Sequence, residues 1–399
     1  MGFSTAAEYA DVSRRVIFKK HVIGFTMNNG IYIHIPFCRN KCDYCSFYSI
    51  AVSNTEIVES YVKTLLNEID YISELHGSSD SDTVYFGGGT PSLLKPAQVE
   101  QILNRISKKF ILSTQSEITL EMNPDDLLSE KLKGFVNSGV NRITLGVQSL
   151  DNEMRSKIGR KGETLTKSGF DLFFSHGGFT RCIDIMAGLP DQKESQLLSD
   201  LETVTTYRPE HISLYLLSVD EDTPLGRRFS PDDVFDNLQA DLWSIAMEYL
   251  EKKDYIHYEI SNYALPGFES RHNSKYWDFT PYFGFGPGAH SFIDGKRYSN
   301  RLQVADYIKS NKFLYEIDTP GTNSIIVEFI MTSMRRMKGF SGEEFAAVTG
   351  IPLPETIVSR LHTLKNEGMI EIEQGRYYLS KNGLFFTDSI IYQLVENYI

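Results

Sequence analysis

The sequence IYIHIPFCRNKCDYCSFYS, residues 31–49, decides the fold and the chemistry available to this chain. It begins with an alternating run of three isoleucines, which predicts a short strand with one apolar face. Three cysteines follow on one loop with the spacing C-x3-C-x2-C: Cys38, Cys42 and Cys45. Three thiolates hold three corners of a cubane iron–sulfur cluster, whereas an electron-transfer cluster usually takes four protein thiolates. The remaining iron is then open to a small molecule, as in a catalytic metal site.

Two other interpretations of the cysteines stay open at this point. Ordinary reduced thiols prefer burial as small hydrophobes, and a polar Arg-Asn-Lys loop gives them no reason to cluster. A zinc site of three cysteines and one histidine is the stronger rival, with His34 as the fourth ligand. His34 shares a strand face with Tyr32, and such a side chain lines a barrel interior as readily as it binds a metal.

Composition and length limit the classes of protein to consider. The 399 residues suffice for one large domain and a small appended one, and the formal net charge is −12. This charge disfavours a broad nucleic-acid footprint, so no nucleic acid is expected as a partner. Cys182 has no obvious disulfide partner, which favours a reducing, cytoplasmic compartment. No run approaches the roughly 20 apolar residues that span a bilayer.

Residues 1–26 have a basic middle but no long apolar run or small-residue cleavage site. They are therefore a poor secretory signal. A transit-like or membrane-surface segment is one interpretation of this stretch. The other, which we favour, is a disordered or mis-called extension, with Met27 as the true start.

The rest of the first 220 residues alternates between strand and helix patterns. Apolar residues at helical spacing predict helices over 53–75 and 97–110. Strands are predicted at 31–35, 83–86, 117–122, 142–147, 181–186 and 211–216. Six strand-then-helix units in a row predict a parallel sheet.

A parallel sheet places its chemistry at the carboxyl ends of the strands. The cysteines, a glycine triplet and three polar residues follow successive strands there: Gly87 to Gly89, Glu121, Gln148 and Asp184. Each polar residue alone is more often a cap or a turn former. The glycines let a backbone approach a ligand, but they match neither a P-loop nor the dinucleotide fingerprint. A nucleotide held through its phosphates is therefore disfavoured.

Residues 255–288 are rich in aromatics and glycines and contain His272-Asn-Ser-Lys-Tyr276-Trp277. In a glycine-rich loop these side chains offer an axial imidazole and flat apolar surface to a porphyrin. Packing around a core edge is the plainer alternative. His290, after Gly-Pro-Gly-Ala, is similarly ambiguous.

The character of the chain changes after residue 322. Helical patterns at 325–337, 342–348 and 354–366 precede a hairpin that turns at Gln374-Gly375, an arrangement that resembles a winged helix. Residues 322–399 hold seven Lys and Arg against nine Asp and Glu. A DNA-binding version needs a basic recognition helix, so we expect a packing or partner-docking module.

Taken together, the chain resembles the oxygen-independent coproporphyrinogen III oxidase family of radical S-adenosylmethionine (SAM) proteins, and within it the haem-chaperone branch. The resemblance covers residues 31 to about 395. It rests on YIHIPFCxxxCxxC, YFGGGTPSLL, ITLEMNP, GVNRITLGVQSLD, IDIMAGLPDQ, HISLYLL, YEISNYALPGFESRHN and GFGPGAHSF. It implies an α/β fold: a partial (β/α)6 radical SAM barrel over 27–300 and a C-terminal helical, winged-helix-like domain over 301–399.

The resemblance also implies cofactors and site residues. The three cysteines match the ligands of a [4Fe-4S] cluster whose fourth iron chelates SAM, and a reduced cluster passes one electron into the SAM sulfonium. Tyr32, Gly88 and Glu121 match contacts to that SAM. The positions that hold a second SAM in the oxidase branch are matched by Tyr44, Gly89, Thr90, Gln148, Arg160 and Asp184. The HNxxYW pattern, associated with haem, is matched by His272, Tyr276 and Trp277.

Three departures from the oxidase pattern bear on the branch. Phe47 stands where oxidases have an additional cysteine, and the oxidases' longer N-terminal segment has no counterpart if Met27 initiates. Gly162 stands where many relatives have a histidine, which questions how closely the pocket around Arg160 is kept.

The chaperone branch implies binding of haem and its transfer to haem-accepting proteins, with a one-electron reductant. It implies a cytoplasmic location, with a peripheral place at the inner face of a membrane left open. Radical decarboxylation of coproporphyrinogen III, radical SAM methyl transfer, haem opening and a zinc-stabilised adaptor are the alternatives. Whether the chain is an enzyme, and whether SAM is cleaved, also stay open.

Overall fold

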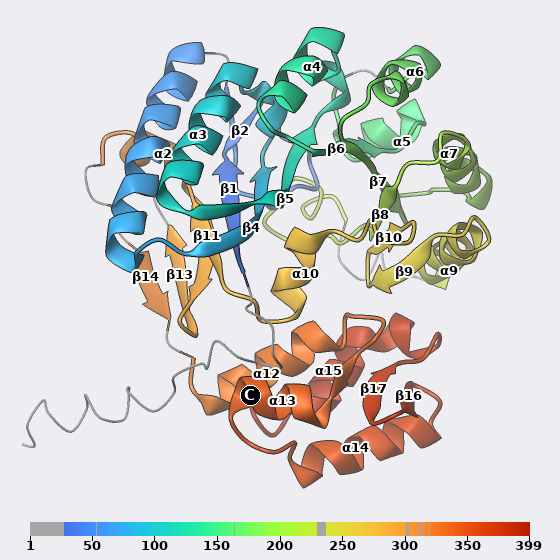
Figure 1. Ribbon diagram of the computed structural model, residues 1–399. Coiled ribbons are helices and arrows are strands. Elements are labelled where there is room, and N and C mark those ends of the chain that lie inside the picture. The colour runs from blue at the N-terminus through green and yellow to red at the C-terminus, as the bar shows by residue number, and fades with distance from the viewer. Residues whose placement is uncertain are drawn as a thin grey trace, which may run out of the picture.

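The computed structural model describes residues 28–399 except 53, 163, 230–236, 301–302, 311–312, 314 and 319. The expectation for residues 1–26 therefore lies outside the described residues. Figure 1 shows a large curved sheet with helices along its outer side, and a smaller C-terminal helical unit packed below it. Among the described residues, no helix is long and apolar enough to cross a membrane.

Six parallel strands form the central part of the sheet, as the sequence predicts. In β1 (Asn29–Ile35) the three isoleucines are fully buried, which matches the apolar face of the alternating pattern. Neighbouring strands follow in chain order: β4 (Asp80–Gly88), β5 (Ile111–Met122), β6 (Arg142–Gln148), β7 (Thr180–Ala187) and β8 (His211–Leu216). All five pairs of neighbouring strands in this group are parallel, so the carboxyl ends of the strands meet at one edge of the sheet.

Helices connect the parallel strands and cover their outer face (Figure 1). Helix α2 (Thr55–His76) begins after Asn54, whose side chain accepts a hydrogen bond from the Glu56 amide, and it buries one apolar stripe. The connecting helices are α2 (Thr55–His76), α3 (Pro96–Lys109), α4 (Ser129–Asn137), α5 (Asn152–Lys157), α6 (Lys167–Ser175), α7 (Glu194–Thr206) and α9 (Asn237–Glu251). Short elements flank the site: β2 (Phe37–Cys38), β3 (Ile50–Ala51), η1 (Pro91–Leu93) and η2 (Pro124–Asp126).

The sheet extends beyond the parallel strands on both sides, which the sequence analysis does not predict. Its order is β14-β13-β12-β11-β1-β4-β5-β6-β7-β8-β10-β9. The added strands are β9 (Ile256–Glu259), β10 (Asn262–Ala264), β11 (Tyr282–Phe285), β12 (His290–Ile293), β13 (Lys296–Asn300) and β14 (Tyr315–Asp318). The expectation of a glycine-rich loop around His272 is wrong, because Ser270 caps a short helix there, α10 (Arg271–Trp277).

The C-terminal unit contains the three predicted helices, the hairpin and one further helix. At the hairpin turn Gln374 and Gly375 have φ angles of 49° and 76°, as a two-residue turn with two positive φ angles requires. Its elements are α12 (Thr322–Ser333), β15 (Phe340–Ser341), α13 (Gly342–Thr349), α14 (Glu355–Asn366), β16 (Ile370–Glu373), β17 (Arg376–Leu379), the short 3-10 turn η3 (Gly383–Phe386) and the further helix α15 (Thr387–Val395). The short helix α11 (Val304–Tyr307) precedes this unit and contacts α2. The domain boundary at residue 300 stays a prediction, and β14 lies on the main sheet beyond it.

Candidate functional site

The three cysteines of the opening stretch lie together on the wall of one cavity. Cys38 ends β2 and is buried, whereas Cys42 and Cys45 lie on the following loop and are partly exposed; all three are free thiols. This cluster cavity has a volume of about 360 Å³. Its wall also contains eight of the predicted SAM residues: Tyr44, Gly88, Gly89, Thr90, Glu121, Gln148, Arg160 and Asp184. The carboxyl ends of five strands thus bring together residues that are up to 146 positions apart, from Cys38 to Asp184.

Two of the cysteine sulfurs accept hydrogen bonds from predicted site residues. The Thr90 hydroxyl donates to Cys38 Sγ over 3.6 Å, and Arg160 Nη1 donates to Cys42 Sγ over 3.6 Å. Arg160 also contacts the Tyr44 hydroxyl at 3.4 Å and donates to the Gly146 carbonyl. Hydrogen bonds of this kind orient a cysteine sulfur for binding a metal. Burial raises the pKa of the Cys45 thiol. A metal ion bound to this sulfur would displace the thiol proton.

The cysteine loop is anchored by aspartates that the sequence analysis missed. Arg39 forms an ion pair of 2.6 Å with Asp126, which is buried and also accepts from Ser92 Oγ (2.7 Å) and Lys131 Nζ (3.0 Å). Asp43 pairs with Arg228 Nη2 at 2.7 Å. In the sequence both aspartates look like ordinary turn residues. Except for Lys131, their partners are far away along the chain, so little in the local sequence marks them.

The glycine triplet lies directly against the cysteine strand. The Gly89 amide donates to the Ile35 carbonyl (2.8 Å), and the Thr90 amide donates to the Phe37 carbonyl (2.7 Å). Gly88 has a φ of 105°, and a Cβ there would lie 2.6 Å from the His34 ring. Only glycine tolerates both the backbone conformation and this close approach. The triplet therefore closes one side of the site without side chains.

Two carboxyl groups face the cluster cavity from neighbouring parts of the sheet. The Tyr85 hydroxyl donates to Glu121 Oε1 over 2.8 Å. Desolvation, reinforced by the negative charge of Asp184, raises the pKa of Glu121 to about 7. Desolvation also raises the pKa of Asp184 to about 6. A cationic ligand beside these groups would favour their charged forms and be held by them.

Three polar atoms on this wall suit a polar ligand. Among the described residues, Gln148 Oε1, Arg160 Nε and Asp184 Oδ1 are buried and have no hydrogen-bond partner. Buried polar atoms in folded proteins are normally paired, so three orphaned atoms around one cavity point to a group that pairs with them. SAM, with its amino, carboxylate and ribose hydroxyl groups, fits this donor and acceptor set.

His34 is not presented to the cysteines as a fourth zinc ligand. Its Nδ1 lies 3.0 Å from the Tyr32 hydroxyl, and its Nε2 lies 2.8 Å from the Tyr48 carbonyl. Both ring nitrogens are therefore engaged by the protein. Within the part of the chain that the structure describes, no three His, Cys, Asp or Glu side chains surround one point as ligands of a single metal ion.

Gly162 has a geometric reason to differ from the histidine of many relatives. Its φ is 97°, and a Cβ there would lie 2.2 Å from Asp125 Oδ2. A histidine would need a different backbone at this position. Arg160 nevertheless reaches Cys42 and Tyr44, so the pocket around this arginine is formed.

A second, larger cavity adjoins the first. This aromatic cavity has a volume of about 990 Å³, at the upper end of the roughly 300–1,000 Å³ typical of ligand sites. Its wall includes Tyr32, His34, Tyr48, Tyr85, Tyr276, Trp277, Tyr282, His290 and Arg335. Five residues belong to the walls of both cavities and form a shared wall: Ser46, Phe47, Gly88, Glu121 and Tyr215. A ligand in the aromatic cavity would therefore lie next to the cysteine site.

The three predicted haem residues do not all reach this cavity. Tyr276 and Trp277 lie on its wall, whereas His272 lies behind them and is only 1% exposed. His272 Nδ1 lies 2.8 Å from Thr83 Oγ1, and its Nε2 lies 2.9 Å from the Tyr276 hydroxyl. Desolvation, with a contribution from Lys275, lowers the pKa of His272 to about 3. The ring is therefore neutral and engaged on both nitrogens.

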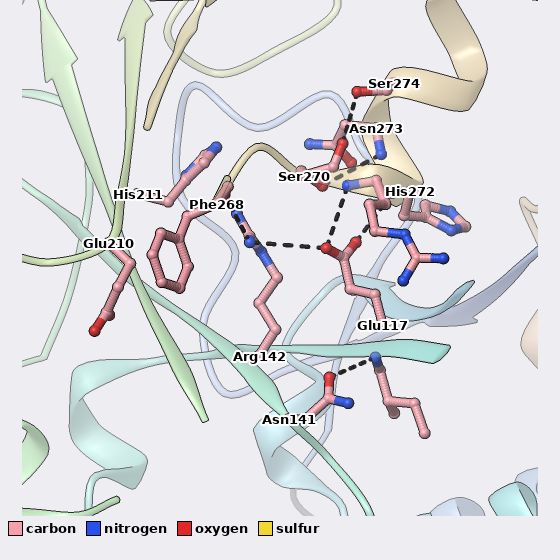
Figure 2. Close-up of polar contacts among 12 residues, drawn as sticks. Glu117, Asn141, Arg142, Glu210, His211, Phe268, Ser270, His272, Asn273 and Ser274 are labelled. Carbon is pink, nitrogen blue, oxygen red and sulfur yellow. Dashed lines mark hydrogen bonds and ion pairs between the residues drawn. The ribbon is translucent and has the colours of Figure 1, made fainter. Parts of the chain in front are cut away.

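Helix α10 is held from below by a buried ion pair, shown in Figure 2. Glu117 accepts hydrogen bonds from the backbone amides of Arg271 (3.2 Å) and His272 (3.0 Å). Arg142 lies 3.7 Å from the same carboxylate and donates to the Phe268 carbonyl over 3.0 Å. Sequence reasoning missed Glu117, because it appears there as one residue of a strand. Glu117 thus fixes the start of the helix that presents Tyr276 and Trp277.

Comparison with family models and known proteins agrees with this architecture. Residues 32–204 match the model of the Radical SAM superfamily, and residues 323–386 match that of the HemN C-terminal domain. Membership in the Radical SAM superfamily implies a [4Fe-4S] cluster and SAM as cofactors. The solved structure of coproporphyrinogen III oxidase (HemN) from Escherichia coli superimposes with a TM-score of 0.79, 17% identity, and coverage of 99% of this chain and 94% of that one. This likeness confirms the fold.

Two curated relatives are more similar in sequence. The heme chaperone HemW of Lactococcus lactis is 32% identical over 89% of this chain and 94% of its own length. The heme chaperone HemW of Bacillus subtilis is 34% identical over 88% of this chain and 95% of its own length. At this identity and nearly full coverage on both sides, the chain belongs to the HemW family of radical SAM proteins.

Proposed function

We propose that this protein is a radical SAM haem chaperone, which binds haem and passes it to acceptor proteins. The relatives that are named heme chaperones cover nearly the whole chain. The observation that supports the proposal best is the aromatic cavity of about 990 Å³, which shares a wall with the cysteine site. A flat, largely apolar macrocycle suits a cavity with six tyrosines and a tryptophan along its wall.

In this proposal the cysteines hold the [4Fe-4S] cluster, and the surrounding polar groups hold SAM. When bound, the cluster supplies one electron for cleavage of a SAM carbon–sulfur bond. Tyr32, Gly88 and Glu121 are assigned to the SAM on the cluster. The remaining predicted residues are assigned to the polar rim of the cluster cavity: Tyr44, Gly89, Thr90, Gln148, Arg160 and Asp184. Arg160 has the further role of orienting Cys42, since its guanidinium donates to that sulfur.

We assign contact with haem to Tyr276 and Trp277. His272 has the role of supporting these two side chains. The hydrogen bond between His272 Nε2 and the Tyr276 hydroxyl fixes the tyrosine against the cavity. Trp277 Nε1 is buried without a hydrogen-bond partner among the described residues, so it is available to a polar group of the ligand.

The shared wall favours a chaperone over an oxidase. Phe47, which replaces the additional cysteine of the oxidases, is 62% exposed between the two cavities. It offers an apolar ring to a bound porphyrin where an oxidase presents a thiol.

The proposal includes haem-accepting proteins and a one-electron reductant as partners. The four cysteines are all free, which supports a cytoplasmic location, and a peripheral place at the inner face of a membrane belongs to the same proposal.

The test is an anaerobic titration of the reconstituted protein with haem and, in parallel, with coproporphyrinogen III, SAM and a reductant. We expect a saturable haem absorption band at one haem per chain and no protoporphyrinogen. Formation of protoporphyrinogen would make the protein an oxidase, and the absence of any saturable haem band would refute the chaperone proposal.

A further inference from the structure

Part of the wall of the aromatic cavity lies where the two units of the molecule meet. Helix α10 contacts α12 of the C-terminal unit (Figure 1), and the Ile260 amide donates to the Arg335 carbonyl over 2.9 Å. Glu259 stands opposite Arg336 in an antiparallel bridge, so the end of β9 and the segment after α12 run side by side. These elements supply three residues to the cavity wall, which we call the junction corner: Glu259, Trp277 and Arg335.

Arg335 carries the positive charge of this corner. Among the described residues that line the cavity, it is the sole lysine or arginine. Its guanidinium has five N–H donors, and within the described chain it donates to the Met331 carbonyl and to Asp388 Oδ1, each over 2.5 Å. The side chain of Asp388 is 87% exposed. An ion pair with so exposed a partner contributes little to stability, so the guanidinium can bind a second carboxylate at low cost.

Trp277 adds a neutral donor to the corner. Its Nε1 is buried and has no hydrogen-bond partner among the described residues. An indole N–H is a donor only, so the group that pairs with it must be an acceptor, such as a carboxylate oxygen. Because buried polar atoms of folded proteins are normally paired, this donor indicates an acceptor that the ligand supplies.

Glu259 supplies a carboxyl group that is suited to share a proton. The residue is 1% exposed, Asn262 Nδ2 donates to its Oε1, and its Oε2 is buried without a partner in the described part of the chain. Desolvation raises the pKa of Glu259 to about 7, which favours the protonated carboxyl group. In that form Oε2 carries the proton and donates a hydrogen bond to an acceptor.

The junction corner thus combines a cation, an indole N–H and a carboxylic acid beside a wall that is rich in tyrosine. This combination suits an anionic group at the edge of a flat apolar ligand. Haem has two such groups, its propionates. A ligand carboxylate beside Glu259 would keep this carboxyl group protonated, because two adjacent carboxyl groups share one proton.

We infer that the junction corner binds one propionate of the haem, and that Arg335 makes the aromatic cavity specific for tetrapyrroles with free carboxyl groups. This inference rests on the proposed haem-chaperone function and deepens it, since it names the part of the ligand that the protein recognises. The contact is a charge-assisted hydrogen bond between guanidinium and propionate, without a covalent or redox step.

The test compares two ligands of the full-length protein: ferric haem, and haem dimethyl ester, in which both propionates are esterified. Both are delivered in the same mild detergent, and binding is followed by absorption. We expect wild type to bind haem at least about tenfold more tightly than the ester. Arg335→Gln should bind haem about as weakly as the ester, and its affinity for the ester should stay within about twofold of wild type.

Two further variants separate ligand binding from a structural role of the ion pair. Asp388→Asn removes the competing partner of Arg335, so it should tighten haem binding by about two- to fivefold, opposite in sign to Arg335→Gln. Arg360→Gln is the matched control, because Arg360 forms a 2.6 Å ion pair with Glu396 in the same unit but is not part of the wall of the aromatic cavity. This control should change neither affinity.

The outcomes distinguish this inference from the proposed function. Wild type that binds neither haem nor the ester saturably would refute the proposed function. Equal affinity of wild type for both ligands would refute only the role of the junction corner. Equal weakening of both ligands in Arg335→Gln and in Asp388→Asn would also refute it, because the ion pair would then be purely structural. A parallel titration with SAM covers the other source of a carboxylate: loss of SAM affinity in Arg335→Gln, with haem binding unchanged, would assign the corner to SAM instead.

Discussion

At the scale of single residues, the cysteines differ in their surroundings more than in their chemistry. Cys38 lies on the cluster cavity and accepts a hydrogen bond from Thr90, whereas Cys182 is buried in β7. Desolvation raises the pKa of Cys182 to about 12, so its thiol is protonated and inert at neutral pH. The chain therefore provides its own control for cluster assembly.

We expect Cys38→Ser to lower the iron content after anaerobic reconstitution from about four atoms per chain to below about one. Cys182→Ser should leave it unchanged, because that thiol is buried in β7 and is not part of the wall of the cluster cavity. Assays of iron and acid-labile sulfide measure the cluster content of both variants. The visible absorption of the cluster, which comes from sulfur-to-iron charge transfer, checks the result. Equal iron loss in both variants would contradict the assignment.

The raised pKa of Glu121 makes the cofactor-free protein sensitive to pH. Its pKa rises from an ordinary 4.5 to about 7 on folding, chiefly through desolvation. Between these values the folded state binds more protons than the unfolded state, so the free energy of unfolding falls as the pH rises through this window. The same sign holds for Asp184, whose pKa rises from 3.8 to about 6.

Glu121→Gln removes the negative charge that lowers the free energy of unfolding at high pH. We expect the variant to raise the free energy of unfolding at pH 8 by on the order of 1–2 kcal/mol and to change it little at pH 4.5. Urea denaturation of the cofactor-free protein at both values measures the effect. Glu100→Gln, at an exposed position on α3, is the control and should show no pH-dependent difference. An equal gain at both pH values would refute the electrostatic cause.

At the scale of elements, α10 depends on a contact from a distant strand. Glu117 of β5 binds the first two amides of the helix and faces Arg142 of β6 (Figure 2). Removal of its charge leaves a buried guanidinium without compensation.

We expect Glu117→Gln to lower the free energy of unfolding by about 1–3 kcal/mol, because one amide oxygen still accepts a hydrogen bond while the charge is lost. It should also weaken haem binding, since α10 presents Tyr276 and Trp277. The exposed Glu100→Gln again serves as the matched control, with an expected change within about 0.5 kcal/mol. Wild-type stability in Glu117→Gln would show that the ion pair is not needed to hold α10.

The elements also show how far a sequence can be interpreted on its own. The six parallel strands β1, β4, β5, β6, β7 and β8 have dense apolar or alternating patterns. Their predicted bounds agree with the structure to within a few residues, except that β5 begins six residues earlier, at Ile111. The strands that extend the main sheet after residue 255 are only three to five residues long, too short for a periodic pattern. The same is true of α10, seven residues long, which exists through its Ser270 cap and its contact with Glu117. Such elements are determined by tertiary contacts.

The candidate site also combines residues that the local sequence reveals with residues that only tertiary contacts reveal. Residues at strand ends could be grouped from the sequence, because parallel strands align their carboxyl ends, and all but Tyr32 of the proposed SAM residues face the cluster cavity. Tyr32 faces the aromatic cavity instead. Asp126 and Glu117 could not be found, since their partners are brought near only by folding.

At the scale of the whole molecule, the C-terminal unit shares its core with the barrel. One continuous group of buried apolar residues extends from Ile31 of β1 to Val395 of α15. Trp243 of α9 is 5% exposed and packs edge-on against Phe385, with ring centroids 5.4 Å apart. The Ile260 amide donates to the Arg335 carbonyl over 2.9 Å, which joins the two units through the backbone as well.

We therefore expect the cofactor-free protein to unfold in one step. The chain has two tryptophans, so Trp277→Phe leaves Trp243 as the reporter of the contact between the units. Fluorescence of that variant and far-ultraviolet circular dichroism should show the same denaturant midpoint. An earlier fluorescence transition would mean that the C-terminal unit separates first.

The shared wall makes the two cavities neighbours that use the same side chains. A ligand in either cavity would contact Phe47 and Glu121. Thermodynamic reciprocity then governs the pair: if SAM changes the dissociation constant of haem by some factor, haem must change that of SAM by the same factor. Release of haem is therefore linked to the occupancy of the cysteine site by SAM. A cell with little SAM would alter how tightly the protein holds haem, and the reverse.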